Sequence, residues 1–255
     1  MLEKFLFDAE KEARPLRIFV GVCIITCVAG VINYFLGGNA LFLVALVALA
    51  ICAPLTNYIW SMDKEEIETQ LKENELIYRH EKELVVFWSA FAGIVLGMFL
   101  LGQGFFLGPT LINDFTYQQA FVNQISGHAT QTQGSFASIL INNIGVLLFT
   151  FIVCLFSLSG LMLVIVWNAS IVSYYLLQLG STQMAAKHAF LLLGHGLLEI
   201  GGYVLVGIAG SLISYKTTRG HSLKNRLDVM FWKDFTTLVV MSIVMIVLGA
   251  VLEVL

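Results

Sequence analysis

Apolar residues fill most of this chain in long runs, and short polar segments separate the runs. A helix that crosses a membrane needs about 20 mainly apolar residues, and most of these runs reach that length. The pattern therefore predicts an all-α, polytopic integral membrane helix bundle with about seven spans. The predicted spans are residues 17–36, 40–60, 84–107, 138–158, 161–180, 188–215 and 235–254.

Two short segments decide how the runs are divided. Residues 37–39 (Gly-Gly-Asn) leave room only for a tight turn between the first two spans. Residues 138–179 are almost continuously apolar, which is too long for one crossing. Residues 157–160 (Ser-Leu-Ser-Gly) are the interior weak point that leaves two membrane-length halves, so we expect the chain to turn there.

The positions of lysine and arginine predict the orientation. They cluster before the first span, between spans two and three, and between spans six and seven, whereas Lys187 is the only one across residues 83–215. Because basic loops favour the cytoplasmic side, we expect the N-terminus inside, the C-terminus outside and the loop 108–137 outside. An alternative topology makes two of the later segments, 161–180 and 188–215, re-entrant.

Composition supports a multi-pass protein of the cell membrane. The chain is 58% hydrophobic and 12% charged, with a mean hydropathy of +0.85 and a net charge of −3. No cluster of basic residues alternates with aromatics, so nucleic acid is not an expected partner. The four cysteines all fall in apolar runs, which favours packing over disulfides or a metal site, and we expect no cofactor.

The chain divides into three parts. Residues 1–60 contain an amphipathic N-terminal helix and the first membrane hairpin, and residues 61–84 predict a charged cytoplasmic helix. Residues 85–255 form the membrane core, with the outer loop 108–137. Because eight acidic and four basic side chains lie in 61–84, we expect that helix to face solvent or a protein partner rather than anionic lipid. The loop 108–137 is a second expected site for protein partners.

Polar residues mark the centre of the predicted bundle. His195 and Glu199 are four residues apart and so share one helix face, and ionisable groups at that depth need a partner, a wet cavity or protonation. Asn142, Asn143 and Asn168 bring amides to comparable depth, and Asn168 can bridge to His195 or Glu199. The Asn142-Asn143 pair can instead cap the outer start of the fourth span. We expect these five residues to form an intramembrane polar cluster.

Three interpretations of this cluster remain open. It can be a hydrogen-bonded pair that locks helices together, a contact for a transported solute, proton or lipid, or a catalytic site. A zinc site would need a third ligand beside His195 and Glu199, which only His128 or His188 could supply if the chain folds back. Catalytic residues and a bound metal are therefore not expected, and a non-enzymatic role is favoured.

Glycines indicate where helices approach closely. Gly93 and Gly97 have the small-xxx-small spacing, and the predicted sixth span is also rich in glycine. Close packing in the core or a dimer face explains both, and we expect a homodimer or larger assembly. A helix broken at Gly201 and Gly202 would instead favour a transporter-like site.

Three ordered motifs resemble the stage II sporulation protein M family. They are the Asn142-Asn143 pair opening a span, Asn168-Ala169 after Trp167, and His195-Gly-Leu-Leu-Glu199 followed by glycines. The resemblance covers about residues 84–255. Asn168-Ala169 stands where many bacterial members have Asn-Gly, which looks more like the archaeal branch.

The resemblance implies a function as well as a fold. The family's namesake is a membrane scaffold that holds peptidoglycan-degrading enzymes at the septum of sporulating bacteria. By resemblance, this chain is expected to be a non-enzymatic scaffold in envelope or membrane remodelling. The alternative is a transporter or channel that uses His195 and Glu199 as an intramembrane site.

Overall fold

The computed structural model describes residues 14–60, 76, 80–103, 136–181, 186–218 and 225–254. Three predicted features therefore lie wholly or mostly outside the described residues. They are the amphipathic helix at 1–15, the charged helix at 61–84 and the outer loop at 108–137.

The described part of the chain is helical throughout and contains no strand. Its long helices agree in place with the seven apolar runs, and a single 3₁₀ turn lies between two of them. The elements are α2 (Pro15–Phe35), α3 (Ala40–Trp60), α6 (Glu81–Gln103), α8 (Phe136–Phe156), η1 (Leu158–Gly160), α9 (Leu161–Ser181), α10 (Ala186–Thr218) and α11 (Asn225–Val254).

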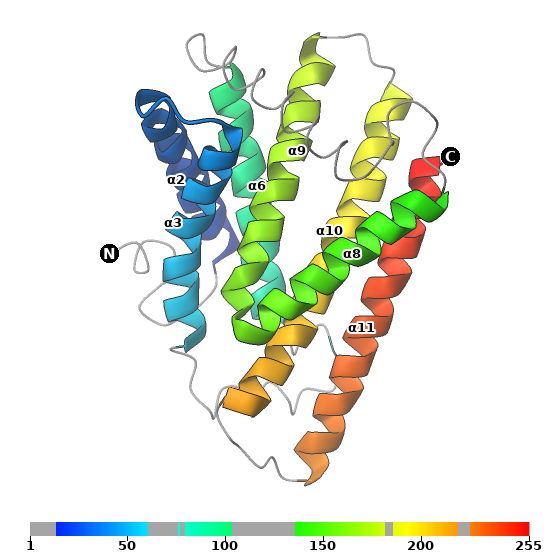
Figure 1. Cartoon of the computed structure of the whole chain (residues 1–255). Helices are drawn as coiled ribbons and strands as arrows, with labels where there is room; N and C mark the ends of the chain where they lie inside the picture. Colours follow the sequence, from blue (N-terminus) through cyan, green and yellow to red (C-terminus); the bar gives the residue numbers. More distant parts are fainter. Residues whose placement is uncertain are drawn as a thin grey trace.

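Six of these helices are long and apolar enough to cross a membrane. The exception is α3, whose described apolar stretch, Phe42–Cys52, is shorter. Consecutive helices run in opposite directions along the bundle (Figure 1). That arrangement is compatible with the predicted seven crossings, but the number of crossings and the orientation of the termini stay predictions.

The turns form where the sequence predicts them. Between α2 and α3, Gly37 adopts a φ of +63°, a left-handed conformation that glycine takes without strain. The side chain of Asn39 then accepts a hydrogen bond from the backbone N–H of Phe42 (3.0 Å), which caps the start of α3. The long apolar run of 138–179 breaks at η1, between α8 and α9.

The helices pack in two groups. In the first group, α2 packs against α6 and α3, while α9 packs against α6 and α3. In the second group, α10 packs against α11 and α8, and α8 also contacts α11. Figure 1 shows α8 lying obliquely across α10 and α11. Contacts between α9 and α10, together with η1, join the two groups.

The glycine pair of α6 packs inside the chain. A Cβ on Gly93 would lie 2.5 Å from the carbonyl oxygen of Phe19, and one on Gly97 would lie 2.7 Å from Cβ of Thr26. Both neighbours belong to α2, so the two glycines let α6 and α2 approach closely. Of the two roles expected for this pair, core packing is the one that the structure shows.

The last helix begins earlier than its predicted span. Hydropathy placed the span at 235–254, with a cytoplasmic loop before it, whereas α11 starts at Asn225. The charged residues near its start lower the hydropathy without breaking the helix. One of them, Asp234, is fully buried.

Candidate functional site: a buried amide–carboxylate bond

A hydrogen bond between two polar side chains ties α8 to α10. The Nδ2 of Asn143 donates to the Oε1 of Glu199 at 2.5 Å. Asn143 is only 5% exposed, and it shares the buried face of α8 with Leu147, Thr150 and Cys154. Because a bond to a charged acceptor is stronger than one between neutral groups, an ionised Glu199 would make this a strong link.

A third helix completes the surroundings of Glu199. Gly249 of α11 lies against it, since a Cβ on Gly249 would be 3.0 Å from Cγ of Glu199 and 3.4 Å from the carbonyl oxygen of His195. Any larger residue at position 249 would collide with the side chain of Glu199. Glu199 therefore sits where α8, α10 and α11 meet.

Asn142 extends the chain of hydrogen bonds outward. Its Nδ2 donates to the Oδ1 of Asn143 at 3.3 Å, while the side chain itself is exposed. Neighbouring residues on a helix point about 100° apart, so only one of the two asparagines can face the interior. The result is an amide relay from the surface of α8, through Asn143, to Glu199.

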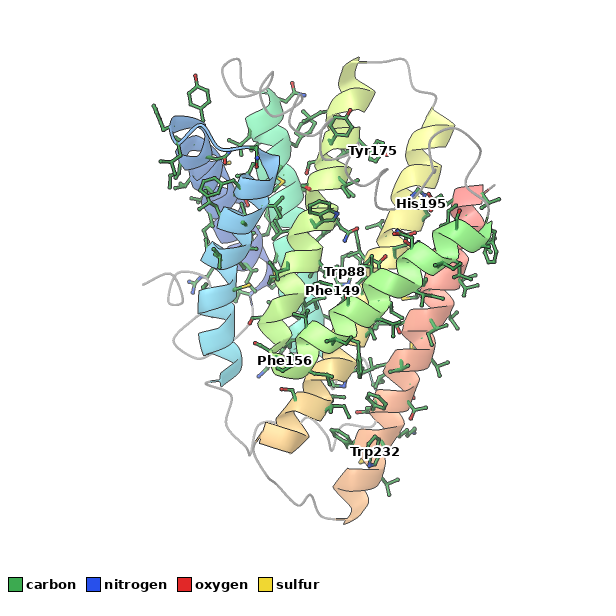
Figure 2. All side chains as sticks on the ribbon, viewed as in Figure 1. Trp88, Phe149, Phe156, Tyr175, His195 and Trp232 are labelled. Carbon is green, nitrogen blue, oxygen red and sulfur yellow. The ribbon has the colours of Figure 1, made fainter. Side chains whose placement is uncertain are left out.

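His195 and Asn168 take different positions from this relay. His195 lies one turn before Glu199 on α10, is partly buried, and is labelled in Figure 2 near the crossing of α8 and α10. Asn168 lies on α9, and its Nδ2 donates to the carbonyl oxygen of Val164 at 2.8 Å, within its own helix. Among the expected cluster residues, hydrogen bonds join Asn142, Asn143 and Glu199.

Two further residues belong to the surroundings of Glu199. Tyr203 is 2% exposed, lies one turn after Glu199 and interacts electrostatically with it. Glu253, near the end of α11, also interacts with Glu199 and Tyr203 across the helix pair. Tyr203 could have been predicted from the sequence, because it lies four residues after Glu199 and so on the same face of the helix. The position of Glu253 could not, because it depends on how α10 and α11 pack.

A second buried polar pair lies between the two helix groups. The Nε2 of His80, just before α6, lies 3.7 Å from the Oδ2 of Asp234 on α11. Both side chains are almost completely buried. Sequence reasoning missed this pair because the two residues are far apart in the chain and Asp234 fell outside the predicted span.

The arrangement around Glu199 is suited to holding helices together. The described residues contain no group of three or more His, Cys, Asp or Glu side chains that could hold a metal ion. Glu199 accepts a hydrogen bond from the amide of Asn143 and lies beside Gly249, so its contacts come from the two neighbouring helices.

A comparison with protein families identifies the kind of chain this is. The family model of stage II sporulation protein M matches residues 38–255. The chain belongs to the stage II sporulation protein M family. The match extends further toward the N-terminus than the resemblance over 84–255 and takes in α3. Comparisons with curated proteins and with solved structures each found no match.

Family membership puts the polar residues in context. Asn142, Asn143, Asn168, His195 and Glu199 all lie inside the matched region. So do both residues of the His80–Asp234 pair. The individual role of each residue in this stage II sporulation protein M homologue stays a prediction.

Proposed function

We propose that this protein is a non-enzymatic scaffold of the cell membrane that acts in envelope or membrane remodelling. The proposal rests on membership of the stage II sporulation protein M family and on its namesake's scaffold role. In this proposal, the helix bundle is a rigid platform, and protein partners bind its exposed segments. The predicted segments are residues 61–84 on the cytoplasmic side and residues 108–137 on the outer side.

The bond between Asn143 and Glu199 is the observation that carries the structural part of the proposal. It joins two helices through partly buried side chains, and Gly249 brings a third helix against Glu199. In lipid, polar groups must be satisfied within the protein, so such a bond favours one arrangement of the helices. A scaffold needs a fixed arrangement of its helices, and it does not need a pathway for solutes through the bundle.

A second candidate function is transport of a proton or small solute. The observation in its favour is that Glu253 lies close enough to Glu199 to interact with it electrostatically, since two neighbouring carboxyl groups can share a proton or attract a cation. Against it, α10 continues without a break through Gly201 and Gly202, where a discontinuous helix was the expected mark of a transporter.

The two functions are separated by comparing stability with flux. Wild type, Glu199→Gln and Glu199→Leu would be purified, unfolded in detergent, and reconstituted into liposomes for proton and solute flux. The scaffold proposal expects no flux from any form. It also expects a loss of about 2 kcal/mol for Glu199→Leu, which leaves the buried Asn143 amide unpaired, and a smaller loss for Glu199→Gln.

Glu253→Gln is the matched control, because it removes the neighbouring carboxylate from an exposed position. It should leave the free energy of unfolding nearly unchanged. A wild-type flux that Glu199→Gln abolishes, without any loss of stability, would replace the scaffold with a transporter.

The archaeal-type branch, suggested by Asn168-Ala169, bears on the partners. If this chain belongs to that branch, its partners are not peptidoglycan-degrading enzymes. Affinity capture of the full chain from its native membrane, followed by identification of the bound proteins, tests this point.

A further inference from the structure

The first turns of α11 extend beyond neighbouring helices. In Figure 1 the start of α11 lies past the ends of α8 and α9, on the side that the basic residues predict to be cytoplasmic. A span needs about 20 apolar residues, and counting back from the end of α11 places the membrane boundary near residue 235. We therefore expect residues 225–234 of α11 to lie at the inner membrane surface.

The sequence that leads into this end of α11 is strongly basic. Between residues 216 and 233, five lysines and arginines accompany a single acidic residue, Asp228. The predicted cytoplasmic segment 61–84 has the opposite balance, with eight acidic and four basic side chains. Anionic lipid headgroups attract basic segments near the membrane surface. Of these two segments, the one that leads into α11 has the charge that suits a lipid partner.

One face of α11 changes from basic to apolar at this level. Val240, Val244 and Val251 are separated by four and seven residues, so they lie on one side of the helix, and all three are exposed. Lys233 is exposed and lies seven residues before Val240, on the same side, and Arg226 is seven residues earlier again. The face therefore has basic positions at the level of the headgroups and apolar positions along the lipid tails.

Lys233 differs from other basic residues on the predicted cytoplasmic side. Arg14, Arg17 and Lys82 each have an interaction within the chain. The ammonium group of Lys233, by contrast, has no hydrogen bond or ion pair among the described residues, and it is exposed. The next residue, Asp234, is fully buried, because neighbouring residues on a helix point about 100° apart. The positive charge of Lys233 is thus presented on the outside of the bundle.

An aromatic side chain marks the same level of α11. Trp232 is 46% exposed and is labelled in Figure 2 near the start of the helix. Its ring makes edge-to-face contacts with Phe231 and Phe235, at centroid distances of 5.3 and 5.8 Å. Tryptophan is enriched where membrane meets water, because its ring is apolar and its N–H is polar. Trp232 therefore supports, apart from the count of apolar residues, a position of Lys233 at the headgroup level.

We infer that the start of α11 binds the phosphate headgroup of an anionic phospholipid. Lys233 is the main contact, Arg226 is a second basic position two turns away, and the exposed valines from Val240 to Val251 lie along the acyl chains. A phospholipid is the occupant because charge gives way to apolar surface along one face of the helix, as it does along a phospholipid. This inference does not depend on the proposed scaffold function.

Native mass spectrometry of the full chain tests the site. The chain is released from a non-ionic detergent with phosphatidylglycerol or phosphatidylcholine of equal chain length, and the bound lipid is measured. Wild type should bind phosphatidylglycerol more tightly. Lys233→Gln should weaken that binding about 5-fold, the effect of one basic residue near an anionic surface, and should leave phosphatidylcholine binding unchanged. Lys233→Arg, which keeps the charge, should bind as wild type does.

Arg14→Gln is the matched control. It removes one positive charge from an exposed residue on the same predicted side, but from one that has an interaction within the chain. Its affinity for phosphatidylglycerol should stay close to that of wild type. Adding Arg226→Gln to Lys233→Gln should weaken binding by a further factor of about 5, and added salt should weaken wild-type binding. Thermal unfolding in lipid-free detergent checks that each variant keeps its fold.

Four results would overturn the inference. The first is equal binding of the two lipids by wild type, which would mean that no headgroup is recognised. The second is an equal loss in Lys233→Gln and Arg14→Gln, which would mean that total charge, not this site, sets the affinity. The third is displacement of the lipid by glycerol phosphate, which would mean a site for a free anion. The fourth is tighter binding of soluble polyglutamate than of lipid, which would mean an acidic protein partner.

Discussion

The two helix groups of this protein are held together by different means. In the first group, α2, α3, α6 and α9 meet through glycines and neutral side chains, as where Cys27 donates to the carbonyl oxygen of Gly97. In the second group, α8, α10 and α11 meet around the carboxyl group of Glu199. Glycines also bring the second group together, since a Cβ on Gly210 of α10 would lie 2.8 Å from the carbonyl oxygen of Phe151 on α8. Both groups therefore depend on close packing, and the second adds a polar bond to a carboxyl group.

This difference predicts where each group is sensitive. Close packing tolerates the loss of a hydrogen bond but not an added methyl group, because a backbone cannot move aside easily. A buried polar bond has the opposite weakness, since removing either partner leaves the other unsatisfied. Substitutions that add volume at a packed glycine should harm either group, and substitutions that remove polarity should harm the second group more than the first.

The pair that joins the groups should give the largest effect. We expect His80→Leu to lower the free energy of unfolding by about 3 kcal/mol, because it takes this partner from the fully buried Asp234. Reversible denaturant unfolding in micelles measures the loss. Lys233→Gln, which changes the exposed neighbour of Asp234, should cost less than about 0.5 kcal/mol. Equal losses in the two variants would show that the His80–Asp234 pair does not join the groups.

Added volume in the first group should come next. Gly93→Val is expected to cost about 2 kcal/mol, because its Cβ would collide with the backbone oxygen of Phe19. Gly196→Val is the matched control in the second group, where nothing lies within 4 Å of the added Cβ. The same unfolding measurement applies, and a control as damaging as Gly93→Val would mean that helix propensity, not packing, sets the loss.

Removing a polar bond from the first group should matter least. Ser173 of α9 donates to the carbonyl oxygen of Val95 on α6 at 3.1 Å and also to that of Ala169 in its own helix. Ser173→Ala should cost only about 0.6 kcal/mol, the typical value for one interhelical bond in a membrane. Thr26→Val, which removes a bond within α2, is its control and should cost less. If Ser173→Ala lowered the free energy of unfolding by more than about 2 kcal/mol, the first group would depend on polar bonds as much as the second.

The sequence predicts the helices well because hydropathy is a local property. The apolar runs place each helix, and Ser157–Gly160 marks the break in the longest run. The start of α11 was the main error, because charges near Asp234 lowered the hydropathy of a segment that is nonetheless helical. Burial of such a charge depends on partners from other parts of the chain, such as His80, and hydropathy does not identify them.

Of the five residues that the sequence places in a polar cluster, hydrogen bonds join Asn142, Asn143 and Glu199. Periodicity placed His195 and Glu199 on one face of α10, but which asparagine reaches that face depends on how α8 is rotated. The structure turns Asn143 inward and Asn142 outward. Asn168 bonds within α9, because its amide lies one turn from the carbonyl of Val164. Partners such as Gly249 come from helix packing, which one sequence does not reveal.

The bond between Asn143 and Glu199 is the central claim, and a double-mutant cycle tests it most directly. The free energy of unfolding would be measured for wild type, Asn143→Leu, Glu199→Leu and the double variant. We predict a coupling of about 1 kcal/mol, with the double variant less damaged than the sum of the two single variants. Additive losses, with no coupling between the two positions, would contradict the claim that this bond holds α8 to α10.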